Sequence, residues 1–287
     1  MMPWTDRAGK FSPFKTAVLA VLLIPALLLT YYFAAGLLGP RPITEAIHET
    51  GDWAIRFLWL SLAITPLRRI GQWPKFIIVR RMIGVAAFFY ALTHFLLYIT
   101  DQKWDLWRVS SEIVLRFYLT IGFVSLLGLA ALAATSTDAA VKRLGKKWNQ
   151  LHKIVYAIAI LTGLHFFLQT KADVFEATIM AGLFMLLMSY RIAHWRGFSL
   201  SSPWVLAGLA VFAGLATAGV EYAWYALATG VPPERVLAAN LQFSYMIRPA
   251  WWVLAIGLSV ALAAFIRGFF VKADAPRGRR AASTLKA

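Results

Sequence analysis

Residues 88–99 read FFYALTHFLLYI, and residues 150–170 read QLHKIVYAIAILTGLHFFLQT. These two apolar stretches hold three of the five histidines of the chain, His94, His152 and His165. A histidine inside a membrane helix is energetically costly, so its presence points to a function. Axial ligation of heme iron by an imidazole nitrogen is a common one. Three such residues on two helices make a membrane cytochrome the first hypothesis.

The composition is that of a membrane protein. Hydrophobic residues make up 60% of the 287 residues and charged residues only 15%. Apolar runs of about 20 residues recur, long enough to cross a hydrocarbon core about 30 Å thick. Because a helix satisfies its own backbone hydrogen bonds in lipid, we predict an all-α, polytopic transmembrane helix bundle. Eight spans are expected, at about 16–39, 48–67, 80–100, 116–134, 149–169, 173–190, 204–228 and 245–269. No cleavable signal peptide stands out, so the first span is interpreted as an anchor.

The distribution of charge predicts the orientation. If the N-terminus is cytoplasmic, most of the 29 lysines and arginines fall on the cytoplasmic side, and most of the 13 acidic residues fall on the other side. The positive-inside rule therefore predicts that both termini are cytoplasmic. The formal charge of +16 is interpreted as this topology signal and as an attraction to anionic lipid, not as nucleic-acid binding.

Depth in the membrane separates the three histidines. The chain has no cysteine, so any heme is held non-covalently, by histidine. At 1.5 Å per residue, His94 lies about 20 Å beyond Arg81 and His165 about 18 Å beyond Lys153, on helices that run in the same direction. We therefore predict that His94 and His165 form an axial pair in the outer half of the membrane. His152 lies about 20 Å nearer the cytoplasm and roughly 140° away around the helix. The alternatives are a hydrogen-bonded packing role for His94 and His165, and a role for His152 other than as a ligand.

Three motifs carry a family resemblance that covers about residues 40–190. They are RRMIG at 80–84 with His94 downstream, TST followed by LGKKWNQLHKIVY within 135–156, and LHFFLQTK at 164–171. The combination resembles the MsrQ (YedZ) family, within the ferric-reductase-like transmembrane superfamily. Its members are heme-binding membrane subunits of bacterial periplasmic methionine sulfoxide reductase systems. The resemblance implies a multi-pass protein of the bacterial inner membrane whose His94, His152 and His165 are associated with heme.

The resemblance also implies the cofactors and partners. It implies heme b and FMN, with quinone as a further candidate ligand. Electrons come from the quinone pool or from a cytosolic flavin reductase. They pass to a soluble periplasmic molybdopterin subunit (MsrP-like) that reduces methionine sulfoxide in oxidised proteins. The chain is then expected to be an electron-transfer subunit, and we assign it no catalytic residue.

Three further residues are candidates for cofactor binding. Arg56 and Arg116 are expected on the outer side, where either can pair with heme propionates or extend to the membrane interface. Trp148 lies in the basic segment 142–153, which is a candidate for binding a flavin phosphate or a reductase. The alternative is that this segment is cytoplasmic positive charge with an interfacial tryptophan.

The chain departs from the family pattern in two places. The family often has Arg-Pro-Tyr at the start of the fourth helix, where this chain has Arg116, Phe117 and Tyr118. We expect little consequence, because proline is only favoured at a helix start. The second departure is an extension of two helices after the core. We therefore expect three parts: an N-terminal helix (1–39), a heme-binding core (40–198) and an extension with a basic cytoplasmic tail (199–287). The extension is expected to carry polar residues near the outer face that are interfacial, dock a partner or line a quinone site: Glu221, Tyr222, Asn240, Gln242 and Arg248.

The predicted function is one-electron transfer across the membrane. Ligation by two histidines leaves no open iron position, which suits electron transfer better than oxygen chemistry. Within the same class, a ferric or other metal reductase and a cytochrome b561-like quinol oxidoreductase are alternatives. From a different class, the alternative is a transporter or scaffold without redox activity, whose histidines bind a proton or a metal ion.

Overall fold

The computed structural model describes residues 4–5, 9–170, 173–244 and 246–273. Arg7, Lys171 and the predicted cytoplasmic tail from residue 274 lie outside the described residues. The described chain is helical apart from loops and one β-bridge between Thr5 and Phe11. Its helices are α1 (Pro13–Ala34), α2 (Pro42–Ile70), α3 (Ile77–Asp101), α4 (Leu106–Leu115), α5 (Phe117–Ala134), α6 (Asp138–Leu144), α7 (Lys146–Leu151), α8 (Val155–Thr170), α9 (Phe175–Trp195), α10 (Pro203–Ala228), α11 (Pro233–Ala239) and α12 (Pro249–Ala273), with the 3-10 helices η1 (Pro74–Phe76) and η2 (His152–Ile154).

Seven helical segments are long and apolar enough to cross a membrane, and they match seven of the eight predicted spans. Those segments contain α1, α3, α5, α8, α9, α10 and α12. The eighth predicted span, 48–67, lies inside α2 but is not among them, because Glu49, Asp52 and Arg56 interrupt its apolar run. α2 is enclosed by the other helices and buries Phe57, Leu58 and many further side chains. An enclosed helix contacts protein rather than lipid on most of its surface, so it tolerates these charges.

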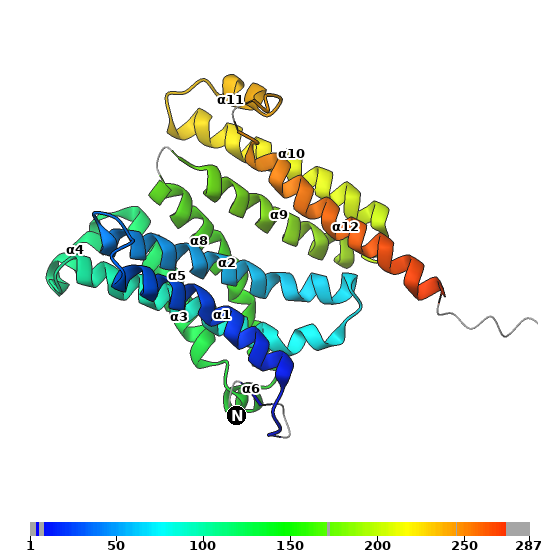
Figure 1. The fold of residues 1–287 in the computed structure, drawn as a ribbon, viewed down its shortest axis with the longest axis horizontal. Coiled ribbons are helices and arrows are strands. Elements are labelled where there is room, and N and C mark those ends of the chain that lie inside the picture. Colours follow the sequence, from blue (N-terminus) through cyan, green and yellow to red (C-terminus); the bar gives the residue numbers. More distant parts are fainter. Residues whose placement is uncertain (1–3, 6–8, 171–172, 245, 274–287) are drawn as a thin grey trace, which may run out of the picture.

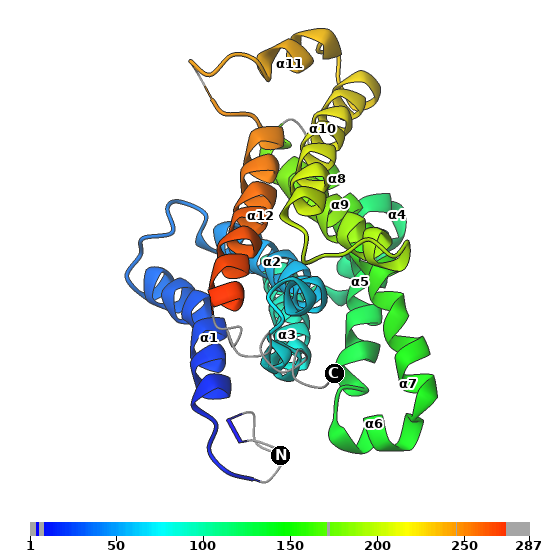
Figure 2. The same cartoon turned by 90° about the vertical axis from the view of Figure 1, so that its right-hand side faces the viewer.

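The helices form two neighbouring groups (Figures 1 and 2). α2 packs along α3, α1 contacts both, and α5 pairs with α8 and contacts α3. On the other side, α9 packs against α2 and α8 and carries α10 and α12. Figure 2 shows α5, α6 and α7 together along one side of the molecule. The main hydrophobic core runs through α2, α3, α8, α9 and α10, so the extension is continuous with the bundle.

Tyr90 joins α1 to α3 at a proline. Pro25 lies within α1 and has no backbone N–H, which disturbs the hydrogen bonds of that turn. The Tyr90 hydroxyl donates to the Leu22 carbonyl and accepts from the Ala26 amide, both at 2.9 Å. A side chain inserted in this way satisfies backbone groups that lipid leaves unpaired.

α4 is a short interfacial helix that the periodicity of the sequence did not predict. Asp105 caps its N-terminus by accepting from the Arg108 amide at 2.9 Å. Trp107 and Leu115 are more than 80% exposed, as expected of a helix that lies in the membrane interface. α5 begins at Phe117, directly after α4, without the family's proline. The Thr120 hydroxyl donates to the Ile113 carbonyl at 2.6 Å across this turn.

The extension buries polar residues that we expected at the interface. The Glu221 side chain is 1% exposed and forms an ion pair with Arg248, so the interfacial interpretation is wrong for Glu221. The Trp224 ring packs against Phe167 of α8, with ring centroids 5.1 Å apart and the ring planes tilted by 43°. Glu221 is buried because α10 packs closely against α9 and α12, so the face of α10 that carries Glu221 points into the bundle.

Candidate functional site

His94 of α3 and His165 of α8 face each other across the interior of the bundle. Their ring centroids are 6.4 Å apart, and the ring planes are nearly perpendicular, at 87°. The proximity predicted from depth is therefore observed, although the two residues are far apart in the sequence. Whether they ligate iron stays a prediction.

Each of these histidines is fixed by a backbone carbonyl of a neighbouring helix. Nδ1 of His94 lies 2.8 Å from the Ile47 oxygen of α2, and Nδ1 of His165 lies 2.8 Å from the Tyr118 oxygen of α5. A carbonyl oxygen only accepts, so Nδ1 carries the proton in both rings. In the neutral imidazole, Nε2 then keeps its lone pair and is the nitrogen available to a metal.

The two rings line a large cavity, which we call the outer cavity. Its volume is about 880 Å³, within the range of sites that enclose a cofactor. Its walls come from α2, α3, α5 and α8 and are apolar at the histidines, with side chains such as Ile55, Phe95 and Leu126. Charged side chains line its mouth, among them Asp52, Arg108, Glu112, Arg116 and Glu176.

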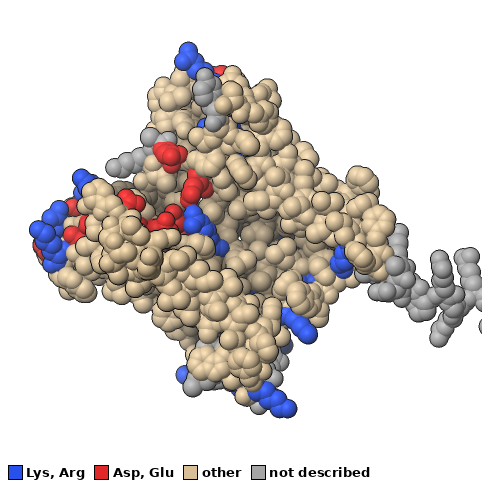
Figure 3. All heavy atoms as spheres, viewed as in Figure 1, with Lys and Arg blue, Asp and Glu red and all other residues tan. Residues whose placement is uncertain are grey.

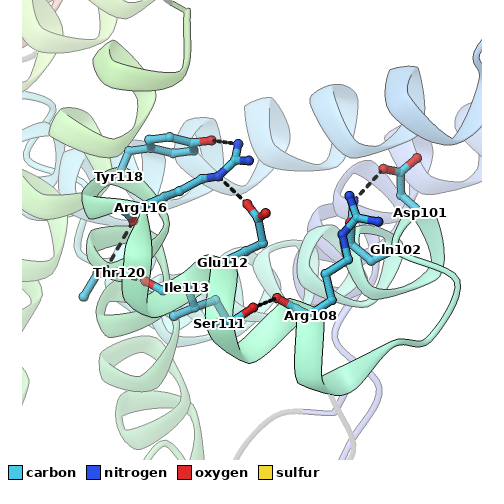
Figure 4. Close-up of polar contacts among 9 residues, drawn as sticks. All are labelled: Asp101, Gln102, Arg108, Ser111, Glu112, Ile113, Arg116, Tyr118 and Thr120. Carbon is cyan, nitrogen blue, oxygen red and sulfur yellow. Dashed lines mark hydrogen bonds and ion pairs between the residues drawn. The ribbon is translucent and has the colours of Figure 1, made fainter.

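The arginines at the mouth come from α4 and its junction with α5 (Figure 4). Arg116 forms an ion pair with Glu112 and donates to the Tyr118 hydroxyl at 3.2 Å. Arg108 also lines the outer cavity, on the preceding turns of α4. Acidic side chains gather around a hollow on the left of the face in Figure 3. The mouth therefore has both arginine and carboxylate groups.

Arg56 occupies a different place from the one we predicted for a cofactor contact. Its guanidinium donates to Glu176 at 3.1 Å and lies 3.9 Å from Asp52. It also lies over the Trp53 ring, 5.1 Å from the centroid. Arg56 is not among the residues that line the outer cavity. Of the two arginines predicted to meet propionates, only Arg116 faces the cavity.

His152 and Trp148 lie together near the end of the bundle that is predicted to be cytoplasmic. Their rings are stacked, with centroids 3.8 Å apart and planes at 25°. Nε2 of His152 lies 3.1 Å from the Thr135 hydroxyl, and Trp148 Nε1 donates to the Thr135 carbonyl at 2.9 Å. Which of the two groups donates depends on the tautomer of the imidazole, but in either case Nε2 has a hydrogen-bond partner. Nε2 of His152 is therefore engaged, unlike Nε2 of the outer histidines.

His152 lines a second, smaller cavity, which we call the inner cavity. Its volume is about 140 Å³, and its basic residues are Arg80, Arg81, Lys153 and Arg191. Arg191 is held by the Leu187 carbonyl at 3.0 Å and the Tyr156 hydroxyl at 3.2 Å. Arg81 pairs with Asp138, and this hydrogen bond holds the pKa of the Asp138 carboxyl below its usual range.

Two leucines separate the cavities. Leu58 of α2 and Leu129 of α5 line both of them. Both are buried, Leu58 at 2% and Leu129 at 6% exposure. We call this pair the leucine wall. It is the apolar layer between the outer and inner sites.

Sequence reasoning missed the supporting residues of the outer cavity. Arg108 was missed because α4 was not predicted. The carbonyls of Ile47 and Tyr118 have no side-chain signature. Gly51 and Gly122, which contact the imidazoles, are visible only as isolated glycines in apolar helices, and such glycines indicate close packing.

The ferric reductase like transmembrane component family matches residues 50–163. Among relatives, the protein-methionine-sulfoxide reductase heme-binding subunit MsrQ of Xanthomonas campestris pv. campestris (strain 8004) is 40% identical over 192 residues, which is 64% of this chain and 87% of the relative. MsrQ of Rhodospirillum rubrum is 41% identical over 189 residues, 65% of this chain and 88% of the relative. The chain belongs to the MsrQ family. No solved structure matches it.

MsrQ membership fits the architecture described above. The matched residues 50–163 contain α3, α5 and most of α2, together with His94 and His152. His165 lies just past the end of this match, and α10 to α12 lie wholly beyond it. The protein is thus a multi-pass membrane protein of the MsrQ family.

Proposed function

We propose that this protein is a membrane b-type cytochrome that carries electrons outward to a periplasmic methionine sulfoxide reductase. The observation that carries the proposal is the pair His94 and His165, held across a cavity of about 880 Å³ with Nδ1 of each ring bound to a carbonyl. The name of the relatives, heme-binding subunit, supports the same cofactor.

The spacing of the two rings fits heme iron. Metal–nitrogen bonds of about 2.0–2.1 Å, added to about 1.1–1.2 Å from Nε2 to the ring centroid, place two opposed imidazoles about 6.2–6.6 Å apart. The observed separation is 6.4 Å. When bound, heme supplies a one-electron couple. His94 and His165 would hold it, the carbonyls of Ile47 and Tyr118 would orient the rings, and Arg108 and Arg116 at the mouth would face its propionates.

The proposed partners follow from the family and from where the outer cavity opens. A cavity with its mouth at the predicted outer face suits delivery to a soluble periplasmic molybdopterin subunit (MsrP-like). The electron source is the quinone pool or a cytosolic flavin reductase, and the location is the bacterial inner membrane. The five lysines and arginines of segment 142–153, together with Arg80, Arg81 and Arg191 of the inner cavity, would supply the basic surface on which a cytosolic donor acts.

FMN, which the family resemblance implies, fits only in part. The inner cavity has the positive charge to bind a phosphate group. At about 140 Å³ it is smaller than the sites that enclose drug-sized ligands. The flavin ring system therefore has no enclosed place in the inner cavity, and we assign the flavin no step.

An absorption spectrum tests the proposal. Protein purified from heme-replete cells and reduced with dithionite is expected to give a b-type spectrum. A folded but colourless protein would overturn the proposal. The reduced protein is then mixed with a periplasmic methionine sulfoxide reductase or with ferric chelates. Oxidation of the heme by the reductase supports the proposed partner.

A ferric reductase is the second candidate function, and the match to the ferric reductase like transmembrane family favours it. Both functions use the same heme pair, so the spectrum does not separate them. Reoxidation by ferric chelates alone, with no transfer to the methionine sulfoxide reductase, would establish the second function in place of the first.

A further inference from the structure

The two outer histidines are each held by the same arrangement of three residues. It consists of a helix carbonyl, a glycine and the histidine itself, and we call it a histidine seat. In each, a carbonyl on one helix accepts from Nδ1 of a histidine 47 residues further along the chain. In each, a glycine lies one helical turn after that carbonyl, where an added Cβ would come within 3.1 Å of the imidazole. One constant shift in residue number converts Ile47, Gly51 and His94 into Tyr118, Gly122 and His165.

The glycines are required by contact with the rings. A Cβ added at Gly122 would lie 2.7 Å from Cε1 and 2.8 Å from Nδ1 of His165. A Cβ added at Gly51 would lie 3.0 Å from Nδ1 and 3.1 Å from Cε1 of His94. Residues four apart lie on the same face of a helix, so the glycine lies beside the carbonyl. Because glycine has no side chain, the imidazole can approach the carbonyl closely enough to form the hydrogen bond. An alanine at Gly122 would force the His165 ring to shift, and an alanine at Gly51 would require the His94 ring to move by a few tenths of an ångström.

The carbonyl in each seat has a free lone pair for the histidine. A helical carbonyl accepts the amide proton of the residue four positions later, which here is the glycine, and it retains a second lone pair. The imidazole uses that lone pair. The angle and the tautomer of each ring are therefore set by one short segment of the neighbouring helix.

We propose that Gly51 and Gly122 are positioning residues for the His94 and His165 ligands, and that α2–α3 and α5–α8 are two equivalent halves of one heme clamp. This inference rests on the proposed heme ligation. According to this inference, the two seats cause the near-perpendicular arrangement of the ring planes, at 87°. Because the Nδ1 hydrogen bond tunes the donor strength of a ligating imidazole, the same seats set the reduction potential.

The test replaces each glycine by alanine. Gly122→Ala and Gly51→Ala are compared with Gly163→Ala and Gly84→Ala, where an added Cβ would approach other atoms no closer than 3.9 Å. The controls lie on α8 and α3, the helices that carry the histidines. Each purified variant is measured for heme per protein, for its low-spin ferric EPR spectrum, which depends on the angle between the imidazole planes, and for its midpoint potential.

We expect Gly122→Ala to lose at least half of its heme or to change its EPR spectrum. We expect Gly51→Ala, with the longer contacts, to keep its heme but change its spectrum and potential. Both controls should match the unmodified protein. If Gly122→Ala does not fold, Gly51→Ala decides the question. Unchanged spectrum and potential in the folded glycine variants would overturn the positioning role.

A parallel His165→Ala variant separates this inference from the proposed function. If His165→Ala loses the heme while the glycine variants are unaffected, the ligation stands and the positioning role fails. If His165→Ala keeps the full b-type spectrum, the ligation itself fails, and the glycine inference fails with it.

Discussion

The outer and inner cavities both contain histidine, but they hold it in different ways. In the outer cavity, Nδ1 of His94 and of His165 is bound to a carbonyl, so Nε2 is left for a ligand. In the inner cavity, Nε2 of His152 is bound to Thr135 and one face of the ring is covered by Trp148. The outer cavity is also about six times larger, at about 880 against 140 Å³. A histidine in a membrane helix is therefore informative only together with its hydrogen bond and the space beside it.

Replacement of the three histidines should give the largest contrast between the cavities. His94→Ala and His165→Ala each remove one of the two proposed iron ligands and should abolish most of the b-type absorbance. His152→Ala should retain the heme of the outer cavity. Heme per protein, measured by reduced absorption spectra on monodisperse samples, checks this. Loss of the outer heme in His152→Ala would show that the two cavities are not independent.

Removal of the leucine wall should destabilise the bundle while leaving the heme ligands in place. Leu58 is 2% exposed, so Leu58→Ala should cost about 2–5 kcal/mol through lost packing and the cavity it leaves. Leu127, on α5, is 54% exposed, and Leu127→Ala is the matched control with a small expected effect. The measurement is the temperature at which each variant aggregates in detergent. Equal temperatures for the two variants would contradict a packed wall between the cavities.

A charge at the mouth of the outer cavity should change the heme potential by a smaller amount. Arg108 lines this cavity and Arg56 does not. Arg108→Gln removes a positive charge that favours reduced heme, so the midpoint potential should fall by roughly 10–40 mV, which corresponds to the value of an exposed charge pair of about 0.2–1 kcal/mol. Arg56→Gln should change the potential less. A larger shift in Arg56→Gln than in Arg108→Gln would reverse the assignment. Redox titration of the heme absorbance measures both.

The smallest effect is expected at the ion pair beside the inner cavity. Asp138 and Arg81 are both about 40% exposed, so Asp138→Asn should change the stability by less than about 0.5 kcal/mol. The hydrogen bond from Arg81 lowers the pKa of Asp138 in the folded protein. Its contribution is therefore present at neutral pH and is lost as the pH falls below the ordinary range of an aspartate. Thermal melts at neutral and acidic pH, with and without the substitution, measure it; a large effect at neutral pH would contradict the exposed geometry.

The sequence predicted those features that depend on hydrophobic length and on depth. Seven spans and the proximity of His94 and His165 follow from run length and from the distance of each histidine to the basic residues at the inner face. The span 48–67 was harder to judge, because α2 buries many side chains and two of its charged residues, Asp52 and Arg56, take part in ion pairs. The pairing of Arg56 with Glu176 joins residues 120 positions apart, and no periodicity reports such a contact. The buried pair of Glu221 and Arg248 was missed for the same reason.

The leucine wall also has a consequence for how the membrane voltage acts on the protein. The mouths of both cavities carry charged side chains, whereas Leu58 and Leu129 form an apolar layer between them. An apolar layer has a low dielectric constant, so part of the membrane voltage would fall across it. A charge that crosses a membrane potential gains or loses about 2.3 kcal/mol per 100 mV. In the outward direction proposed here, the electron moves toward the positive side of an energised membrane. The voltage would therefore add to the driving force for repair in the periplasm, and two side chains would define the gap across which it does so.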